Sequence, residues 1–181
     1  GKKYTLTVKY SGRTLTAETV VPEPVPIRKY EVIPSQTNDT LYSIKIYFED
    51  NPERKDYYKV FAKVKNSDNR YFPAFMGNLS DELLDGEAFM TVNRGLRHTM
   101  IDKYSPLFGP DDTVYVKFAH IPAEGFEFWN SYDNEVTNGN NILFPNTSNL
   151  KSNISGGRGI WCGYGTDIMR IIIGEENRDG K

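Results

Sequence analysis

Apolar and polar residues alternate along several stretches of the chain, and turn-forming residues bound each stretch. Alternation with a period of two places successive side chains on opposite faces of a strand, so each stretch predicts a half-buried β-strand. The pattern as a whole predicts a mainly β fold, an antiparallel β-sandwich or partial barrel. The expected strands are residues 4–10, 15–21, 30–33, 41–48, 57–64, 88–92, 113–121 and 166–173.

Helical periodicity is confined to two places. In residues 123–135, Phe126, Trp129 and Tyr132 recur at every third position, which predicts a short helix with one aromatic face. Such a stripe more often packs against a core than stacks on a ligand such as a sugar. A single helical turn is expected at residues 80–86, with Ser80 as its cap and Gly86 at its end.

A proline-rich run divides the chain near its beginning. Pro22, Pro24 and Pro26 fix φ and remove backbone donors, so the segment is expected to be an extended connector. We therefore expect a hairpin at residues 1–21, a linker at 22–29 and a mainly β domain at 30–181. An isolated two-stranded hairpin is marginally stable in water, so this one must pack against another part of the molecule.

The charge balance argues against one class of partner. The 181 residues include 22 Lys and Arg and 24 Asp and Glu, which gives a formal net charge of −2. A nucleic-acid-binding surface would need a basic excess, and the short basic run at residues 94–98 does not supply one. No apolar run is long enough to span a bilayer, and no signal peptide is recognised. The single cysteine, Cys162, excludes an internal disulfide and is expected to be a small buried hydrophobic residue.

Glycines are concentrated in residues 152–165, among Ile, Trp and Tyr. Gly156, Gly157 and Gly159 are each expected to hold a backbone conformation or a close approach that a Cβ would obstruct. Because the segment leads into an apolar run, it is interpreted as a kinked or bulged strand. A phosphate-binding loop is the alternative, but the segment lacks the Gly-Lys-Ser/Thr ending of a P-loop and precedes a strand rather than a helix.

No group of residues has the spacing of a catalytic or metal-binding site. His98 and His120 are the only histidines, and neither has a partner at a characteristic spacing. Asp50, Glu53 and Asp56 offer oxygen ligands for calcium, but their spacing misses the EF-hand pattern, so a solvated turn is the favoured interpretation. The sequence therefore predicts no catalytic residue, no metal and no cofactor.

Aromatic residues outside the helical stripe are the candidates for contact with a ligand or partner. Tyr57 and Tyr58 begin an expected strand, and Tyr71, Phe72 and Phe75 lie in an expected loop that contains a proline. Loops carry many binding residues, and aromatic side chains supply a large contact area. The alternative is that Phe72 and Phe75 cap the open end of the β-core.

Three segments bear on the family. They are residues 4–8 together with 17–22, the strand–helix unit at 114–129, and the run Asn-Ile-Ser-Gly-Gly-Arg-Gly-Ile at 153–160. Together they resemble a family of uncharacterised Bacteroidetes envelope lipoproteins, often encoded beside TonB-dependent outer-membrane receptors. The last segment is the most specific, because family members carry an Asn-Ile-x-Gly-Gly-x-Gly-Ile-Phe-like run near their end. Here Trp161 stands in the place of that Phe.

The resemblance implies an outer-membrane lipoprotein of the bacterial cell envelope, either periplasmic or surface-facing. It also implies that the hairpin forms the last two strands of an immunoglobulin-like domain. We expect a non-enzymatic accessory or binding module associated with outer-membrane uptake. Its expected partners are a TonB-dependent receptor or other envelope protein, a glycan or a peptide, with no nucleic acid. The membrane would be contacted only through a lipid anchor outside this sequence.

A glycan-acting hydrolase is the alternative function. Such an enzyme uses two carboxylates that can be distant in sequence, so residue spacing does not reveal them. A cleft that holds two Asp or Glu side chains roughly 5–10 Å apart would favour the hydrolase. A shallow aromatic surface without such a pair would favour the binding module.

Overall fold

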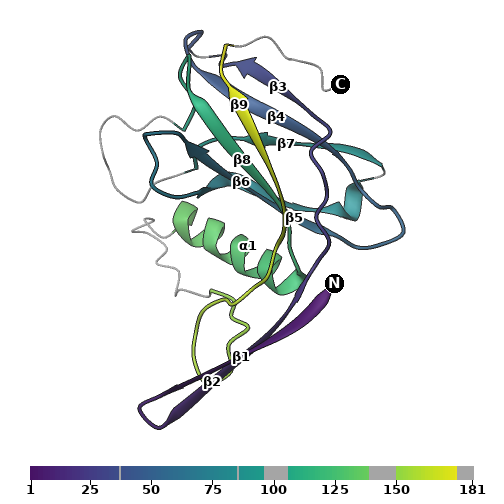
Figure 1. The fold of residues 1–181 in the computed structure, drawn as a ribbon, viewed down its shortest axis with the longest axis vertical. Coiled ribbons are helices and arrows are strands. Elements are labelled where there is room, and N and C mark those ends of the chain that lie inside the picture. Colours follow the sequence, from purple (N-terminus) through teal and green to yellow (C-terminus); the bar gives the residue numbers. More distant parts are fainter. Residues whose placement is uncertain (37, 85, 96–105, 139–149, 175–181) are drawn as a thin grey trace.

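A computed structural model describes residues 1–36, 38–84, 86–95, 106–138 and 150–174. In these ranges the chain forms nine strands, one α-helix and one short 3-10 helix, and every strand pairing is antiparallel. The described strands lie in three separate sheets that do not close into a barrel. The predicted mainly β fold is confirmed, and of the two expected architectures the sandwich is the one formed (Figure 1).

Most strands fall close to the stretches where alternation predicts them. The helix α1 (Ala123–Asn138) also forms where expected, and it continues beyond residue 135. The strands are β1 (Lys2–Tyr10), β2 (Arg13–Val21), β3 (Lys29–Pro34), β4 (Tyr42–Glu49), β5 (Tyr57–Val64), β6 (Phe72–Ser80), β7 (Glu87–Val92), β8 (Thr113–His120) and β9 (Gly165–Ile172).

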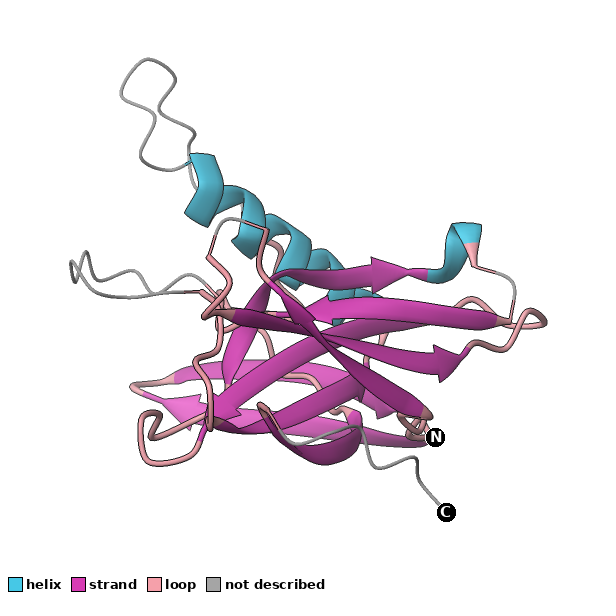
Figure 2. Ribbon diagram, turned by 90° about the horizontal axis from the view of Figure 1, so that it is seen from above, coloured by secondary structure: helices cyan, strands magenta, loops and turns pink. Residues whose placement is uncertain are grey.

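Two sheets pack face to face to form the core. One has the strand order β3-β4-β7 and the other β6-β5-β8-β9, and Figure 2 shows them as two layers. Ile46 and Phe48 of β4, Val60 of β5 and Phe118 of β8 are fully buried between the layers. The ring centroids of Phe48 and Phe118 lie 4.6 Å apart. Burial of these alternate apolar positions is the main force that holds the layers together.

Helix α1 covers one end of the outer face of the four-stranded sheet. Phe126 and Trp129 pack against a second apolar cluster that includes Phe61 of β5 and Ile121 after β8. The indole Nε1 of Trp129 donates a hydrogen bond to the hydroxyl of Tyr164 at 3.0 Å. These two residues of the predicted aromatic stripe therefore attach the helix to the sheet.

A buried ion pair also joins α1 to the sheet. The side chain of Lys59, on β5, is fully buried, and its Nζ lies 3.0 Å from Oδ2 of Asp133 on α1. The same ammonium group lies 5.0 Å from the ring centroid of Trp129. Burial lowers the pKa of Lys59, and Asp133 partly opposes that shift. The buried charge of Lys59 has Asp133 as its partner only when the helix lies in this position on the sheet.

Removing the carboxylate of Asp133 should test this attachment. Asp133→Ala leaves a buried ammonium without its partner, so we expect the free energy of unfolding to fall by about 3–5 kcal/mol in urea denaturation. The folded state holds a lowered Lys59 pKa, so the unfolded chain binds more protons below the ordinary value of 10.5. The free energy of unfolding of Asp133→Ala should therefore rise as the pH approaches 10.5, and its difference from that of the unaltered protein should become smaller.

The matched control removes both charges. In the double variant Lys59→Met/Asp133→Leu no charge is buried, and stability should stay close to that of the unaltered protein. A single Asp133→Ala variant as stable as the unaltered protein would show that the ion pair does not hold the helix.

The segment expected to be an aromatic loop is a strand instead. β6 forms the edge of the four-stranded sheet and pairs with β5. Pro73 is accommodated because an edge strand needs backbone donors on one side only. The pairing is interrupted by a register shift between Lys59 and Phe61, and Met76 has a positive φ of 53°. This irregularity breaks the period-two pattern, which is why the alternation does not reveal the strand.

The expected helical turn after β6 is a short 3-10 helix, η1 (Asp81–Leu83). Ser80 precedes it but makes no side-chain hydrogen bond that would cap it. The predicted position is therefore right, whereas the predicted cap is wrong.

The hairpin of β1 and β2 packs against the glycine-rich segment. Thr16 and Ser155 form one antiparallel bridge. The backbone nitrogen of Thr16 lies 3.1 Å from the carbonyl oxygen of Ser155, and that of Ser155 lies 2.8 Å from the carbonyl oxygen of Thr16. The amide of Asn153 donates to the carbonyl oxygen of Glu18 at 3.2 Å. Residues 156–164 are irregular, so the expectation of a kinked strand there is wrong, and the strand begins at Gly165. The hairpin and the glycine-rich segment are therefore joined by one backbone bridge and by side-chain hydrogen bonds, without a continuous β-ladder.

The proline-rich linker is extended but packed against the sandwich. Ile27 is buried in the core, and its N–H donates to Asp167 of β9 at 2.8 Å. The carbonyl oxygen of Glu23 lies 2.7 Å from Nδ1 of His120. The segment thus connects the hairpin to β8 and β9 and is not a free spacer.

The three glycines of residues 156–159 are each constrained in a different way. Gly156 has a φ of +81°, and a Cβ there would lie 2.7 Å from the carbonyl oxygen of Thr14. A Cβ at Gly157 would lie 2.7 Å from a methyl group of Leu15, which is the movable end of a side chain. Gly159 has a φ of +141°. Gly156 is therefore the position where both the backbone angle and a fixed backbone neighbour exclude a side chain.

Gly156→Ala should destabilise the protein more than Gly12→Ala does. Gly12 has a similar φ of +75° but no atom within 4 Å of the added Cβ, so its replacement carries only the left-handed strain of about 1–2 kcal/mol. At Gly156 the contact with Thr14 adds to that strain. Thermal and urea unfolding of both variants measure the difference, and equal losses would show that the approach of Thr14 is not limiting.

Candidate functional site

The structure does not bring the five predicted contact aromatics together. Tyr58 is fully buried in the core and therefore offers no contact surface. Tyr57 lies against Phe126 of α1, with ring centroids 4.7 Å apart. Tyr71 and Phe72 are half-buried at the start of the edge strand β6, and Phe75 is half-buried further along it. Tyr57 and Tyr71 thus pack against one apolar cluster under α1, whereas Tyr58 lies in the core and Phe75 borders a separate hollow.

Phe75 is the predicted residue that borders a hollow lined by both apolar and polar side chains. We call this hollow the side groove; it measures about 340 Å³ and lies between the edge strands β6 and β7. Met76 and Phe89 are its most exposed apolar side chains, at 77% and 54%. The groove is lined by Phe75, Met76, Asn78, Leu79, Phe89, Met90, Thr91 and Asn93.

A side-chain amide holds the two walls of the side groove together. Oδ1 of Asn93, after β7, accepts from the N–H of Phe75 at 2.9 Å, and its Nδ2 donates to the Phe75 carbonyl oxygen at 3.1 Å. The amide thus occupies both backbone groups of Phe75 as a neighbouring strand would. The next residue, Met76, is held at a φ of 53°, which is unfavourable for a side chain of its size. Backbone strain of this kind is concentrated at functional surfaces.

Sequence reasoning missed Met76 and Phe89. A signal was available for Phe89, because Ala88, Met90 and Val92 of β7 point into the core and Phe89 occupies an outward position. On the outer face the ring lies 6.1 Å from that of Tyr47, and the ammonium of Lys45 lies 3.8 Å from its centroid. No comparable signal marks Met76, because its exposure follows from the irregular pairing of β6.

One pair of carboxylates lies in a hollow, as the alternative function requires. Glu49 and Glu87 are opposite each other in β4 and β7 and line a hollow of about 450 Å³ with Tyr47. Arg28 pairs with Glu49 at 3.1 Å and Lys29 with Glu87 at 3.5 Å. Both carboxylates are largely exposed. A glycosidase acid needs apolar surroundings that keep it protonated, and this pair does not have them.

A second group of acids forms a buried polar cluster with Tyr58. The Tyr58 hydroxyl donates to Oδ1 of Asp50 at 2.5 Å. The guanidinium of Arg54 donates to both oxygens of Asp56, at 2.6 and 2.8 Å, and His120 Nε2 lies 3.1 Å from Oδ1 of Asp56. Asp50 and Asp56 are only 4% and 2% exposed, so the interpretation of residues 50–56 as a solvated turn is wrong for these two acids.

The buried polar cluster supports the fold instead of presenting a reactive group. Burial raises the pKa of Asp50, against the hydrogen bond from Tyr58, and burial also raises the pKa of Tyr58. Nδ1 of His120 faces the carbonyl oxygen of Glu23, so the cluster reaches the proline-rich linker. In the described ranges no three His, Cys, Asp or Glu side chains are placed to hold a metal ion.

Tyr58→Phe should weaken the fold through this cluster. The variant leaves a buried carboxylate of Asp50 without its hydroxyl donor, so we expect a loss of about 1–3 kcal/mol in the free energy of unfolding. Tyr42→Phe is a suitable control, because the Tyr42 hydroxyl makes no hydrogen bond to a described residue. Urea unfolding measures both, and a Tyr58→Phe variant no less stable than the control would contradict the role of the hydroxyl.

Of the remaining candidates, Cys162 is described by the structure and is not a reactive group. Cys162 is a half-buried free thiol beside α1, and burial raises its pKa to about 11. A thiol with such a pKa is a poor nucleophile at neutral pH. His98 and the basic run at residues 94–98 lie partly or wholly outside the described residues.

Residues 1–168 match the family described as Domain of unknown function (DUF4249). The chain belongs to this family. No curated protein and no solved structure matches it. The matched residues include the helix, the glycine-rich segment and every strand of the sandwich except the second half of β9, and the match confirms the resemblance to an uncharacterised family.

Among the described residues, no helix combines the length and the apolar character needed to cross a bilayer. The main helix, α1, lies with its aromatic side against the sheet.

Proposed function

We propose that this chain is a non-enzymatic binding module of the bacterial cell envelope. In this proposal it is an outer-membrane lipoprotein that assists uptake by contacting a partner protein, such as a TonB-dependent receptor, through the side groove. The envelope setting rests on the resemblance carried by residues 4–8, 17–22, 114–129 and 153–160. The contact rests on the geometry of the groove.

The observation that carries the proposal is the exposure of Met76 and Phe89 beside a hollow. Apolar side chains gathered around a concave surface mark interaction sites in soluble proteins. Phe89 supplies a rigid ring, and Met76 supplies a side chain that adapts to the shape of a partner. The strain at Met76 adds to this argument, because a glycine or asparagine would adopt the same φ more easily. An apolar segment of a partner protein fits this chemistry.

The hydrolase receives less support from the same structure. Glu49 and Glu87 are a carboxylate pair in a hollow, but each already has a cation and stands in solvent. The acids of the buried polar cluster, Asp50 and Asp56, are closed off from any polymer by burial. A binding module needs neither pair.

Met76→Asn provides a sharp test of the side groove. Asparagine tolerates a positive φ, so the variant should be at least as stable as the unaltered protein. It lacks the apolar contact, so it should bind the partner less well. We expect co-purification with a TonB-dependent receptor from outer membranes of the native host to fall at least tenfold for Met76→Asn and Phe89→Ser, on the order of a hot-spot loss.

Tyr10→Ser is the matched control, because Tyr10 is 75% exposed on the hairpin and away from the groove. It should leave recovery unchanged. Equal recovery of the receptor with all three variants, or no recovery of a receptor with the unaltered protein, would overturn the proposed contact.

A further inference from the structure

The outer face of the four-stranded sheet extends beyond helix α1. Lys63 of β5, Tyr115 of β8 and Arg170 of β9 are directly opposite one another in register and point to this face. Lys117 lies in the next row of β8, on the same face. We call this surface, which also includes two residues after β5, the cationic face: Lys63, Lys65, Tyr71, Tyr115, Lys117 and Arg170.

No acid among the described residues neutralises the positive charges of the cationic face. None of its four cations forms an ion pair with a described residue. The ammonium of Lys117 lies 4.1 Å from the ring centroid of Tyr71, and burial lowers the pKa of Lys117 without an opposing acid. The nearby carboxylate of Asp68 is buried and already accepts from the N–H of Val64 at 2.7 Å and from Arg94 at 3.0 Å.

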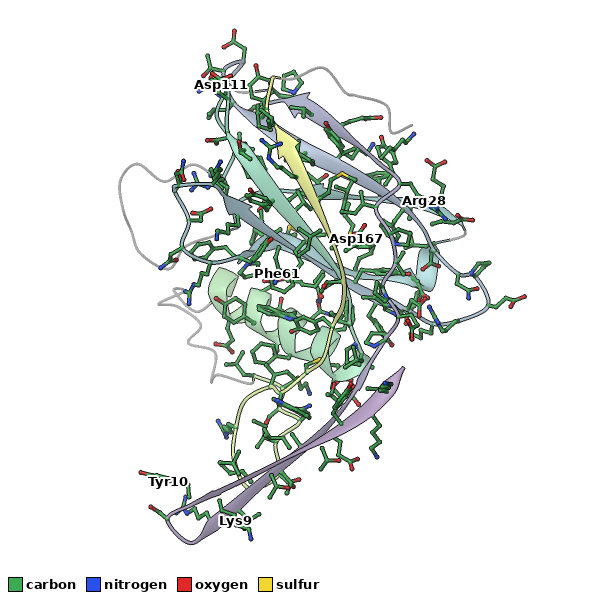
Figure 3. All side chains as sticks on the ribbon, in the orientation of Figure 1. Lys9, Tyr10, Arg28, Phe61, Asp111 and Asp167 are labelled. Atoms are coloured by element: carbon green, nitrogen blue, oxygen red, sulfur yellow. The ribbon has the colours of Figure 1, made fainter. Side chains whose placement is uncertain are left out.

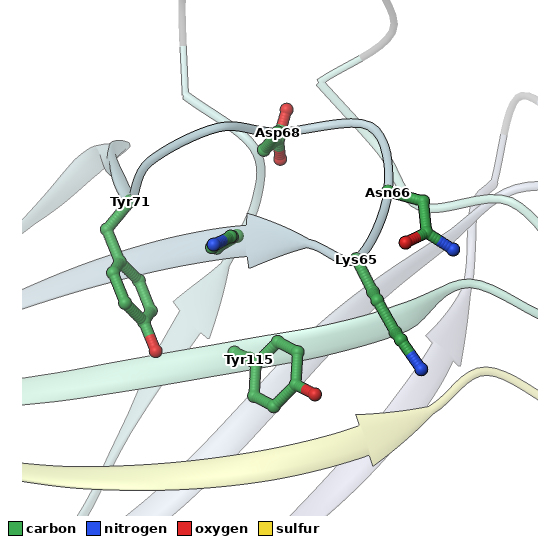
Figure 4. A pocket seen from close by; sticks show the side chains of 6 residues that line it. Lys65, Asn66, Asp68, Tyr71 and Tyr115 are labelled. Atoms are coloured by element: carbon green, nitrogen blue, oxygen red, sulfur yellow. The ribbon is translucent and has the colours of Figure 1, made fainter.

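A hollow of about 510 Å³ lies within the cationic face. Figure 4 shows Tyr71 at one side of it, Lys65 and Asn66 at the other, and the ring of Tyr115 between them. Burial raises the pKa of Tyr71, so its hydroxyl stays neutral and able to donate a hydrogen bond. The hollow is therefore lined by two aromatic rings, two lysines, Asn66 and the carboxylate of Asp68. Lys117 and Arg170 lie on the same face beside it, next to Tyr71 and Tyr115.

We propose that the cationic face binds an anionic saccharide, an oligosaccharide whose rings carry carboxylate or sulfate groups. Ammonium and guanidinium groups form charge-assisted hydrogen bonds with such anions. The tyrosine rings supply flat apolar surfaces for the C–H faces of the sugar rings. The backbones of Lys63 and Arg170 are two strand spacings apart, roughly 10 Å, so a short oligosaccharide can meet both ends of the row.

The geometry disfavours other anionic partners. β5 and β8, which carry Lys63, Tyr115 and Lys117, are interior strands with both edges paired, so at these positions no free backbone is available to an extended peptide. Only β9, which carries Arg170, is an edge strand. A hollow suits a discrete ligand better than the surface of a membrane. A net charge of −2 does not provide the broad positive field that nucleic acids require. The cationic face shares no residue with the side groove, so a result that contradicts one of the two proposals does not contradict the other.

Isothermal titration calorimetry of the whole chain tests the site. The probes are tetragalacturonate, its fully methyl-esterified uncharged form, and a chondroitin sulfate tetrasaccharide. We expect at least one anionic probe to bind at least tenfold more tightly than the esterified form. Chondroitin sulfate carries both carboxylate and sulfate groups, so tighter binding of it than of tetragalacturonate would indicate that sulfate adds to recognition. Arg170→Gln and Lys117→Met should each weaken that binding about tenfold, the loss of one charge-assisted contact.

Two control proteins and one stability measurement make the result specific. Lys9→Met removes an exposed hairpin lysine and should leave binding unchanged, as should Met76→Asn in the side groove. Thermal unfolding of Arg170→Gln should match that of the unaltered protein, because its side chain is exposed.

Several results would overturn the proposal. These are no binding of either anionic probe, equal binding of the esterified form, or unchanged binding by Arg170→Gln and Lys117→Met. Equal or tighter binding of polyglutamate, a single-stranded oligonucleotide or anionic phospholipid vesicles would also overturn it, and would assign the surface to a peptide, a nucleic acid or a membrane.

Discussion

The burial of strand β5 on both faces is the constraint on which the rest of the structure depends. Its residues Tyr58, Val60 and Ala62 fill the space between the two sheets, while Lys59 and Phe61 face the helix. Figure 3 shows Phe61 between the sheet and α1. A strand that is buried on both sides fixes the positions of its two neighbours, β6 and β8, and also of the helix. The buried charge of Lys59 makes the position of the helix specific, because few other placements would give it a partner.

The exposed surfaces follow from what β5 and α1 leave uncovered. Because β6 and β7 are the last strands of their sheets, their side chains meet at the flank of the sandwich and form the side groove. Because α1 covers one end of the four-stranded sheet, the row of Lys63, Tyr115 and Arg170 projects from the other end. The side groove thus lies where the two sheets end, and the cationic face lies where helix α1 no longer covers the sheet.

The buried polar cluster joins three parts of the chain that are distant in sequence. Asp56 pairs with Arg54 and faces His120, and the other nitrogen of His120 faces the backbone of the linker. Buried polar groups are costly unless their hydrogen-bonding capacity is met, so the cluster forms only when these segments are in place together. It explains why the linker is packed against the sandwich although its prolines make it look like a spacer.

Sequence alone determined most of the strands, the helix and the mainly β class. These features depend on the spacing of apolar residues within a short window, as in Ile44, Ile46 and Phe48 or in Phe126 and Trp129, and the window contains all the information that the pattern needs. Only the tertiary structure decided that Tyr58 is buried, that residues 72–80 form an edge strand, and that Asp50 and Asp56 leave solvent. Sheet order and contacts between distant segments control these outcomes. The spacing of apolar residues within a short window does not indicate which strand lies at the edge of a sheet or which part of a sheet a helix leaves uncovered.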